Sequence, residues 1–202
     1  MRLSLVSIAA LALLCPLVSG QQELKIWAYD GSWYDRYGGA VALDGERAIV
    51  GAKWADNPGN SSGAVYLHNA VTGAHLLELV WTNSVPGGQL ANEYFGDSVG
   101  ISGSKCVVGA PGTAGGGTVY IFDTATGTQI TELEPADLDS QDEFGDSVAI
   151  SGELVVDTAS VAGDLIVDLV LVEIRHPGAH RVQGAGFLAD GDHLVAEISS
   201  AN

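Results

Sequence analysis

The chain has 202 residues, of which 25 are acidic and 8 are lysine or arginine, so its formal net charge at pH 7 is −17. A surface of this charge repels nucleic acid and anionic lipid, which excludes both as partners. The two cysteines are Cys15 and Cys106. Because Cys15 lies in a cleavable leader, no internal disulfide is expected, and Cys106 is predicted to be a small buried side chain.

Residues 1–20 have the pattern of a secretory signal peptide. Arg2 precedes an apolar run, Leu3–Val18, and small residues lead up to an expected cleavage after Gly20. The run is shorter than the ~20 residues that a membrane helix needs, and no later segment is apolar enough, so no membrane span is predicted. We therefore expect a secreted, extracellular chain with one repeat domain over residues 21–202.

After the leader, Leu24–Tyr29 is predicted to be a single strand at a sheet edge, and a repeat follows. Tyr37–Ala52 reads YGGAVALDGERAIVGA, Phe95–Ala110 reads FGDSVGISGSKCVVGA, and Phe144–Val156 reads FGDSVAISGELVV. Self-similarity of this kind indicates a repeat architecture. A motif inside the repeat is therefore expected to serve the architecture before any chemistry.

Each repeat is predicted to contain four short strands. Those of the second repeat are Ser98–Ser102, Cys106–Gly109, Thr118–Phe122 and Gln129–Glu134. They alternate in polarity or are compactly apolar, and glycine-rich or Asp-rich turns separate them, whereas helical periodicity is missing. This predicts an all-β protein built from four-stranded antiparallel blades of the β-propeller type.

The repeat resembles the FG-GAP repeat, which builds the β-propeller of integrin α chains and occurs in many secreted bacterial proteins. Phe-Gly, a Val-x-Ile strand and Gly-Ala-Pro follow one another in the family's order. The positions that carry the resemblance are Tyr37, Gly38, Gly51, Ala52, Phe95, Gly96, Gly109, Ala110, Pro111, Phe144 and Gly145. The resemblance implies extracellular binding or adhesion, an inference from fold analogy.

Two departures from the family pattern stand out: Lys53 replaces the proline in the first copy, and Asp157-Thr158 stands where Gly-Ala is expected in the third. Blades start near residues 37, 95 and 144, and the tail, residues 159–202, is divergent. Within the tail, Gly163–Leu169 is expected to be the third strand of blade three, and Gly184–Val195 resembles a further start. Three to four units predict a partial, open or small propeller, and open sheet edges would permit self-association.

The resemblance also raises the question of calcium, because integrin-type repeats often hold an acidic calcium loop between the FG and GAP strands. Here the corresponding turns, Ser102-Gly103-Ser104 and Ser151-Gly152-Glu153, are too short to supply six to eight oxygen ligands. No cofactor is therefore expected. The alternative calcium ligands are Asp137, Asp139 and Asp142, in an acidic run that continues to Glu143 and Asp146 and that otherwise reads as a solvated loop.

A second resemblance, to GDSL-type serine hydrolases, is carried by FGDS at Phe95–Ser98 and Phe144–Ser147. It would make Ser98 or Ser147 the nucleophile, His193 the base and Asp190 its orienting partner. The serines recur in repeat register and the family's Gly-x-Asn-Asp block is missing. We therefore predict no enzymatic activity and keep the esterase as an alternative.

The predicted function is recognition of an extracellular protein or glycan through blade loops. The candidate loops are Ala55–Ser62, Ser84–Glu93, Pro111–Gly116 and Asp137–Glu143. An aromatic platform for sugar or peptide is the other candidate, with core packing as its alternative; it comprises Trp33, Tyr34, Tyr37, Tyr94 and Phe95. A structural repeat unit within a larger secreted assembly is the remaining alternative.

Overall fold

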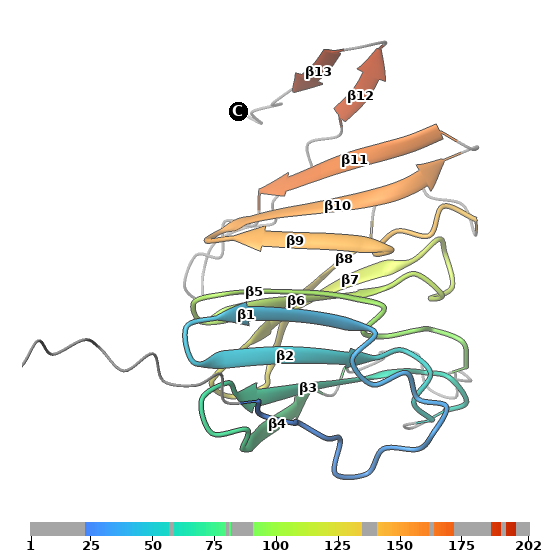
Figure 1. Ribbon diagram of the computed structural model, residues 1–202. Coiled ribbons are helices and arrows are strands. Elements are labelled where there is room, and N and C mark those ends of the chain that lie inside the picture. Colours follow the sequence, from blue (N-terminus) through green and yellow to red (C-terminus); the bar gives the residue numbers. More distant parts are fainter. Residues whose placement is uncertain are drawn as a thin grey trace, which may run out of the picture.

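The computed structural model describes residues 23–56, 59–79, 81, 91–134, 141–161, 164–171, 187–190 and 193–196, with the backbone alone from residue 158 onward. All regular elements in these ranges are β-strands (Figure 1). The all-β prediction is therefore confirmed. None of the described residues forms a helix that is long and apolar enough to cross a membrane.

The first two repeats each form a four-stranded antiparallel sheet whose strands follow in chain order. Blade one contains β1 (Ala40–Asp44), β2 (Arg47–Ala52), β3 (Ala64–Asn69) and β4 (His75–Leu79). Blade two contains β5 (Ser98–Ser102), β6 (Lys105–Ala110), β7 (Thr118–Asp123) and β8 (Gln129–Leu133). This confirms the predicted four strands per repeat.

Burial explains the different strand sequences. Strands β6 and β7 are almost continuously apolar, and nearly all of their residues are buried, because both faces of the sheet are covered by neighbouring sheets. The outer strand β8 alternates between exposed and partly buried residues, as an edge strand covered on one face does.

The third repeat has three strands in the described region: β9 (Ser147–Ser151), β10 (Leu154–Val161) and β11 (Asp164–Leu171), in the sheet order β11-β10-β9. The predicted strand at Gly163–Leu169 is confirmed by β11. A hairpin of β12 (Phe187–Asp190) and β13 (His193–Ala196) lies within the predicted further start at Gly184–Val195. Strand β12 lies beside β11 (Figure 1).

The backbone shows that the three blade starts are equivalent. Arg36, Tyr94 and Glu143 precede the Tyr-Gly or Phe-Gly pairs and adopt positive φ angles of 54°, 57° and 51°. The glycines of those pairs, Gly38, Gly96 and Gly145, have φ angles of 85°, 89° and 95°. This left-handed conformation is rare for residues other than glycine, so its recurrence at three matched positions confirms the repeat.

Strand register corrects one part of the sequence alignment. Gly109 pairs with Ser98 in blade two, and Thr158 pairs with Ser147 in blade three. The residue in the place of the GAP glycine is therefore Thr158, and Asp157 takes the place of Val108. The assignment of Asp157-Thr158 to the Gly-Ala pair was wrong by one residue: counted without a gap from Phe144, as Gly109 and Ala110 are from Phe95, the matching residues are Thr158 and Ala159.

The prediction of a strand at Leu24–Tyr29 is also wrong. The segment has no ladder partner; it is held instead across the outer strands of blade one by side chains. The ring of Tyr29 packs edge-on against Tyr66 at 6.2 Å, and its hydroxyl donates to Glu78 at 2.6 Å. This hydrogen bond raises the pKa of Tyr29 to about 12. An apolar stretch such as LKIWAY fits such a crossing segment as well as it fits a strand.

Successive blades are joined backbone to backbone. Parallel bridges link Gly63 to Phe95 and Gly117 to Phe144. The N–H groups of Phe95 and Phe144 donate to the carbonyl groups of Ser62 (3.0 Å) and Gly116 (2.6 Å). These contacts place each FG pair against the preceding sheet, where both phenylalanines are fully buried.

Two core layers lie between successive blades, and a third cluster packs Ala28 and Tyr37 against Tyr66 on the other face of blade one. Phe95 lies with Ile49 and Leu67 of blade one and Phe122 of blade two, in a cluster that also contains the buried Cys106. Phe144 lies with Val107 and Ile121 of blade two and Val155 of blade three. The predicted burial of Cys106 is confirmed, and burial raises the pKa of its thiol to about 12.

Candidate functional site

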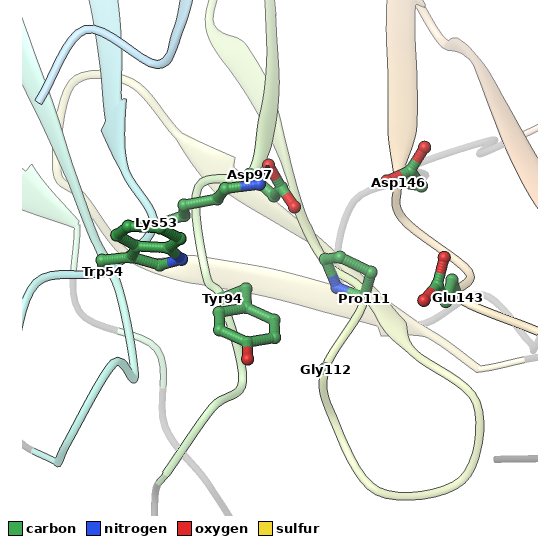
Figure 2. A pocket seen from close by; sticks show the side chains of 8 residues that line it. All are labelled: Lys53, Trp54, Tyr94, Asp97, Pro111, Gly112, Glu143 and Asp146. Carbon is green, nitrogen blue, oxygen red and sulfur yellow. Dashed lines mark ion pairs between the residues drawn. The ribbon is translucent and has the colours of Figure 1, made fainter. Parts of the chain in front are cut away.

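A cleft of about 360 Å³ opens at the end of the blades where the FG pairs meet the GAP turns (Figure 2). We call it the turn cleft. Its lining residues come from all three blades and are Lys53, Trp54, Tyr94, Asp97, Pro111, Gly112, Glu143 and Asp146.

Repeat positions explain how these residues meet. Tyr94 and Glu143 each precede a Phe-Gly pair, and Asp97 and Asp146 each follow one. The N–H of Asp97 donates to the Tyr94 carbonyl at 2.9 Å, and that of Asp146 donates to the Glu143 carbonyl at 3.0 Å. The same tight turn therefore presents two side chains into the cleft in blades two and three. The left-handed φ of its first residue costs of order 1 kcal/mol, which the inter-blade packing must offset.

Charge is distributed unequally between the two blade boundaries. Lys53 of blade one reaches forward, and its Nζ lies 2.6 Å from Oδ1 of Asp97 in blade two. Both side chains are largely shielded, with 27% and 18% exposure. At the next boundary, Pro111 replaces the lysine, and no ion pair to Asp146 or Glu143 occurs among the described residues. Three carboxylates and one ammonium group give the cleft a net negative charge.

An aromatic wall completes the cleft. Trp54 is 37% exposed and carries the guanidinium of Arg36 at 3.8 Å from its ring centroid. Figure 2 shows Trp54 and Tyr94 on the Lys53 side, with Pro111 between the Lys53–Asp97 pair and Glu143. The Arg36 guanidinium thus occupies one face of the indole, and the carboxylates of Glu143 and Asp146 lie on the far side of Pro111.

The predicted loops contribute in part. Pro111 and Gly112 come from the predicted loop Pro111–Gly116, and Glu143 ends the predicted loop Asp137–Glu143. Lys53, Trp54 and Asp97 were not predicted as site residues, although the Lys53-for-proline departure marked the position; Glu143 and Asp146 belong to the predicted acidic run. No described residue of Ala55–Ser62 or Ser84–Glu93 lines the cleft.

The predicted aromatic platform does not form as one surface. Phe95 is buried in the core, and Tyr37 packs against Tyr66 of its own blade. Trp33 and Tyr34 are almost wholly exposed and lie outside the lining of the turn cleft. Tyr94 alone of the predicted set lines it, so the core-packing alternative holds for Phe95.

The serine positions have a structural role in blade two. The hydroxyl of Ser98 donates to the Gly145 carbonyl at 2.7 Å and so joins blade two to blade three. Ser147 occupies the same position in blade three and is exposed. Asp190 and His193 face each other across the β12–β13 turn in the backbone register, and their side chains lie outside the described part.

The alternative calcium ligands are only partly described. Asp137 and Asp139 lie outside the described residues, and Asp142 is buried. Across the described ranges, no group of three or more His, Cys, Asp or Glu side chains is arranged to hold a metal ion.

Four-stranded antiparallel sheets, repeated along the chain and packed face to face through matched turns, define a protein built of propeller-type blades. A family model described as the FG-GAP repeat matches residues 21–68 and 85–122. These ranges cover most of blade one and the first three strands of blade two. Over these two ranges the chain matches the FG-GAP repeat, as the sequence pattern predicted.

Several solved structures are similar to this chain at low identity. The computationally designed Ika8 protein is 16% identical over 79% of this chain and 42% of its own, with a TM-score of 0.45. The Cps50 (Swd1) beta-propeller domain of Myceliophteria thermophila is 14% identical over 68% of this chain and 36% of its own, with a TM-score of 0.44. The chain thus spans less than half of the length of either. A search among curated proteins found no match.

Proposed function

We propose that this protein is a secreted, non-enzymatic binding module that recognises an extracellular protein through the turn cleft. The proposal rests on a contrast between two matched carboxylates. Asp97 forms an ion pair with Lys53 of the preceding blade, whereas the residue of the blade before Asp146 that corresponds to Lys53 is Pro111, which carries no charge. The adhesion-type role that the family resemblance implies is part of this proposal.

The missing lysine suggests the chemistry of the partner. In blade two, a cation supplied from blade one neutralises the carboxylate that follows the Phe-Gly pair. In blade three, Asp146 is the matching carboxylate, and Glu143 adds a second one. Both can accept hydrogen bonds from a cationic group of a partner protein. A lysine or arginine of a partner protein would complete the arrangement with charge-assisted hydrogen bonds. Trp54 and Tyr94 would cover the aliphatic part of that side chain.

Selection from a displayed random-peptide library tests the proposal. Enriched peptides are expected to contain arginine or lysine. They should lose roughly tenfold in affinity when the chain carries Glu143→Gln and Asp146→Asn together. A control with Glu23→Gln and Glu46→Gln removes two exposed carboxylates elsewhere and should bind as the wild type. Enriched peptides that lack basic residues, or that bind the cleft variant equally well, would refute the proposal.

Secretion rests on residues 1–20, which lie outside the described residues. Expression of the whole chain in a host with a secretory pathway should release a protein whose first residue is Gln21. Retention in the cell with Met1 in place would contradict this part of the proposal and leave the cleft proposal untouched.

A further inference from the structure

The same tight turn opens each blade, and its first residue differs in charge from blade to blade. In blade one, the N–H of Gly39 donates to the Arg36 carbonyl at 2.9 Å. The carbonyl groups of Tyr94 and Glu143 accept in the same way from the residues three positions further on. The matched side chains are therefore a cation in blade one, an aromatic ring in blade two and a carboxylate in blade three.

The guanidinium of Arg36 is held at the border of the turn cleft. Arg36 is exposed, and its guanidinium lies over the ring of Trp54, which lines the cleft. The Trp54 N–H donates to the carbonyl of Asp35 at 3.2 Å, so the indole is tied to the turn that carries the arginine. Stacking of this kind orders the guanidinium and leaves the N–H groups at its edge available as donors.

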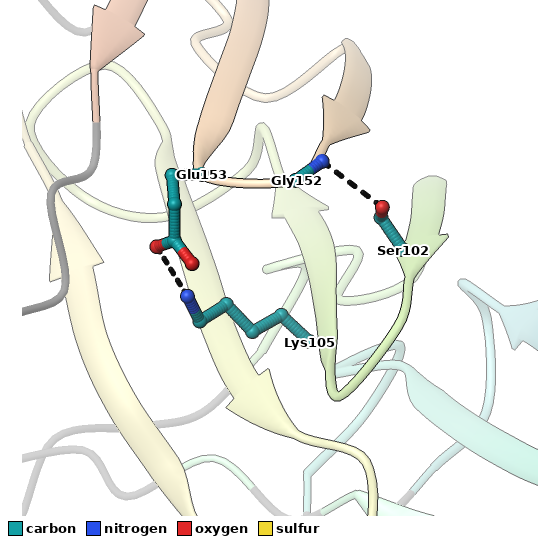
Figure 3. Close-up of polar contacts among 4 residues, drawn as sticks. All are labelled: Ser102, Lys105, Gly152 and Glu153. Atoms are coloured by element: carbon teal, nitrogen blue, oxygen red, sulfur yellow. Dashed lines mark hydrogen bonds and ion pairs between the residues drawn. The ribbon is translucent and has the colours of Figure 1, made fainter.

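Arg36 is also the one lysine or arginine in the described ranges whose charged group has no hydrogen-bond or ion-pair partner in the chain. The partners of the others are Glu23 for Lys25, Asp97 for Lys53, Glu153 for Lys105 and Thr124 for Arg47. Figure 3 shows the Lys105–Glu153 pair, which joins two blades. A chain with 25 acidic and 8 basic residues readily pairs its cations internally. The guanidinium at the cleft is therefore available to an anionic group from outside.

Charge changes sign along the cleft. Figure 2 shows Trp54, which carries the Arg36 guanidinium, and Glu143 on opposite sides of it. The Lys53–Asp97 ion pair lies between them and has no net charge. The cleft thus has a cationic border in blade one, a neutral and aromatic centre, and an anionic end in blade three.

The repeat also sets the distance between the two charged ends. Arg36 and Glu143 belong to matched turns two blades apart, and neighbouring sheets lie about 10 Å apart, which separates the turns by roughly 20 Å. An extended chain rises about 3.3 Å per residue, so about six residues span this distance.

We propose that the turn cleft binds an extended partner segment with charges of both signs, an acidic side chain on Arg36 and a basic one on Glu143 and Asp146, about six residues apart. The inference rests on the proposed function of the cleft and adds Arg36 as a residue that determines specificity. A carboxylate on the guanidinium would accept two parallel N–H bonds. A segment with basic residues alone would leave the guanidinium unpaired, so the second charge discriminates among basic partners.

Display selection with random peptides long enough to span the cleft tests the proposal. Peptides selected on the wild type should carry aspartate or glutamate about six residues from lysine or arginine. Selection on Arg36→Gln should retain the basic residue and lose the acidic one. Lys25→Gln is the matched control, because it removes the same charge from an exposed side chain elsewhere, and it should select both.

Affinities of a selected peptide give the second measurement. Replacement of its acidic residue by the corresponding amide should weaken binding to the wild type roughly tenfold and should leave binding to Arg36→Gln unchanged. The basic residue is an internal control in both experiments, since its contribution depends on blade three and should survive the substitution of Arg36.

The other outcomes separate this inference from the proposed function. Enriched peptides with basic residues and no acidic residue would overturn the inference alone, whereas peptides without basic residues would overturn both. An acidic residue enriched equally on Arg36→Gln would place its contact elsewhere, and one enriched directly beside the basic residue would contradict the arrangement along the cleft. Loss of both residues on Arg36→Gln would show that Arg36 supports the cleft and does not bind the partner.

Discussion

Gly109 of blade two lies directly against the carbonyl group of Gly145 in blade three, and no space is left between them for a side chain. Gly51 and Gly96 have the same relationship one blade earlier. The GAP glycine is therefore a contact residue between sheets, and its absence of a side chain sets how closely two blades can approach.

Gly109→Ala is expected to lower the free energy of unfolding by roughly 2–3 kcal/mol, because overpacking must push the two sheets apart. Gly103→Asn is the control: nothing lies within 4 Å of a Cβ there, and asparagine tolerates the left-handed φ of 58°. Urea unfolding should show the full loss of unfolding free energy for Gly109→Ala and only a small change for Gly103→Asn. Equal losses for both variants would mean that the close contact is not what Gly109 provides.

The pair Tyr37–His68 in blade one takes the place of Phe95–Phe122 in blade two. The Tyr37 hydroxyl and His68 Nε2 lie 2.8 Å apart, and the ring centroids lie 6.2 Å apart, against 5.8 Å for the two phenylalanines. Burial, followed by the neighbouring His75, lowers the pKa of His68. Its folded-state pKa lies below its unfolded value of about 6.5, so protonation favours the unfolded chain.

The contribution of His68 to stability is therefore complete above about pH 6.5 and is lost as the pH falls below it. Tyr37→Phe combined with His68→Phe copies the blade-two pair and removes this titration. Between about pH 8 and about pH 5, the free energy of unfolding should fall less for the double variant than for the wild type. Parallel pH curves for the two proteins would rule out His68 as a source of acid sensitivity.

Cys106 should be chemically inert in the folded protein. Burial raises the pKa of its thiol to about 12, with a smaller contribution from Asp123, so almost no reactive thiolate exists near pH 8. Mass spectrometry after iodoacetamide treatment should show unmodified Cys106 in buffer and full modification in urea. Rapid labelling without urea would show that the core layer opens.

Ser98→Ala should act on stability without acting on ester hydrolysis. Loss of its hydrogen bond to Gly145 is expected to cost about 1 kcal/mol. No turnover of a chromogenic acetyl ester above buffer is expected from the wild type. Turnover that disappears with Ser98→Ala or Ser147→Ala would instead establish the hydrolase alternative.

The sequence predicted the blades well because the repeat fixes strands and turns locally: the FG pairs, the hairpin glycines and the apolar inner strands each recur in register. Contacts between blades were harder to predict. The Lys53–Asp97 pair joins two repeats, so it needs the relative placement of the sheets, which no single repeat contains. The register of Thr158 was available from the sequence, because an ungapped count from the Phe-Gly pair places Thr158 at the position of Gly109, as the β9–β10 pairing shows. Leu24–Tyr29 shows that a short apolar run does not distinguish a strand from a segment packed across a face.

The central claim is that each FG pair bonds to the sheet before it, and nuclear Overhauser spectroscopy on the labelled protein tests it most directly. The parallel bridges predict cross-peaks between the Phe95 amide proton and the Gly63 α-protons, and between the Phe144 amide proton and the Gly117 α-protons. Their presence, with slow exchange of both amide protons, is the expected result. Absence of both pairs of cross-peaks in a folded protein would contradict the account.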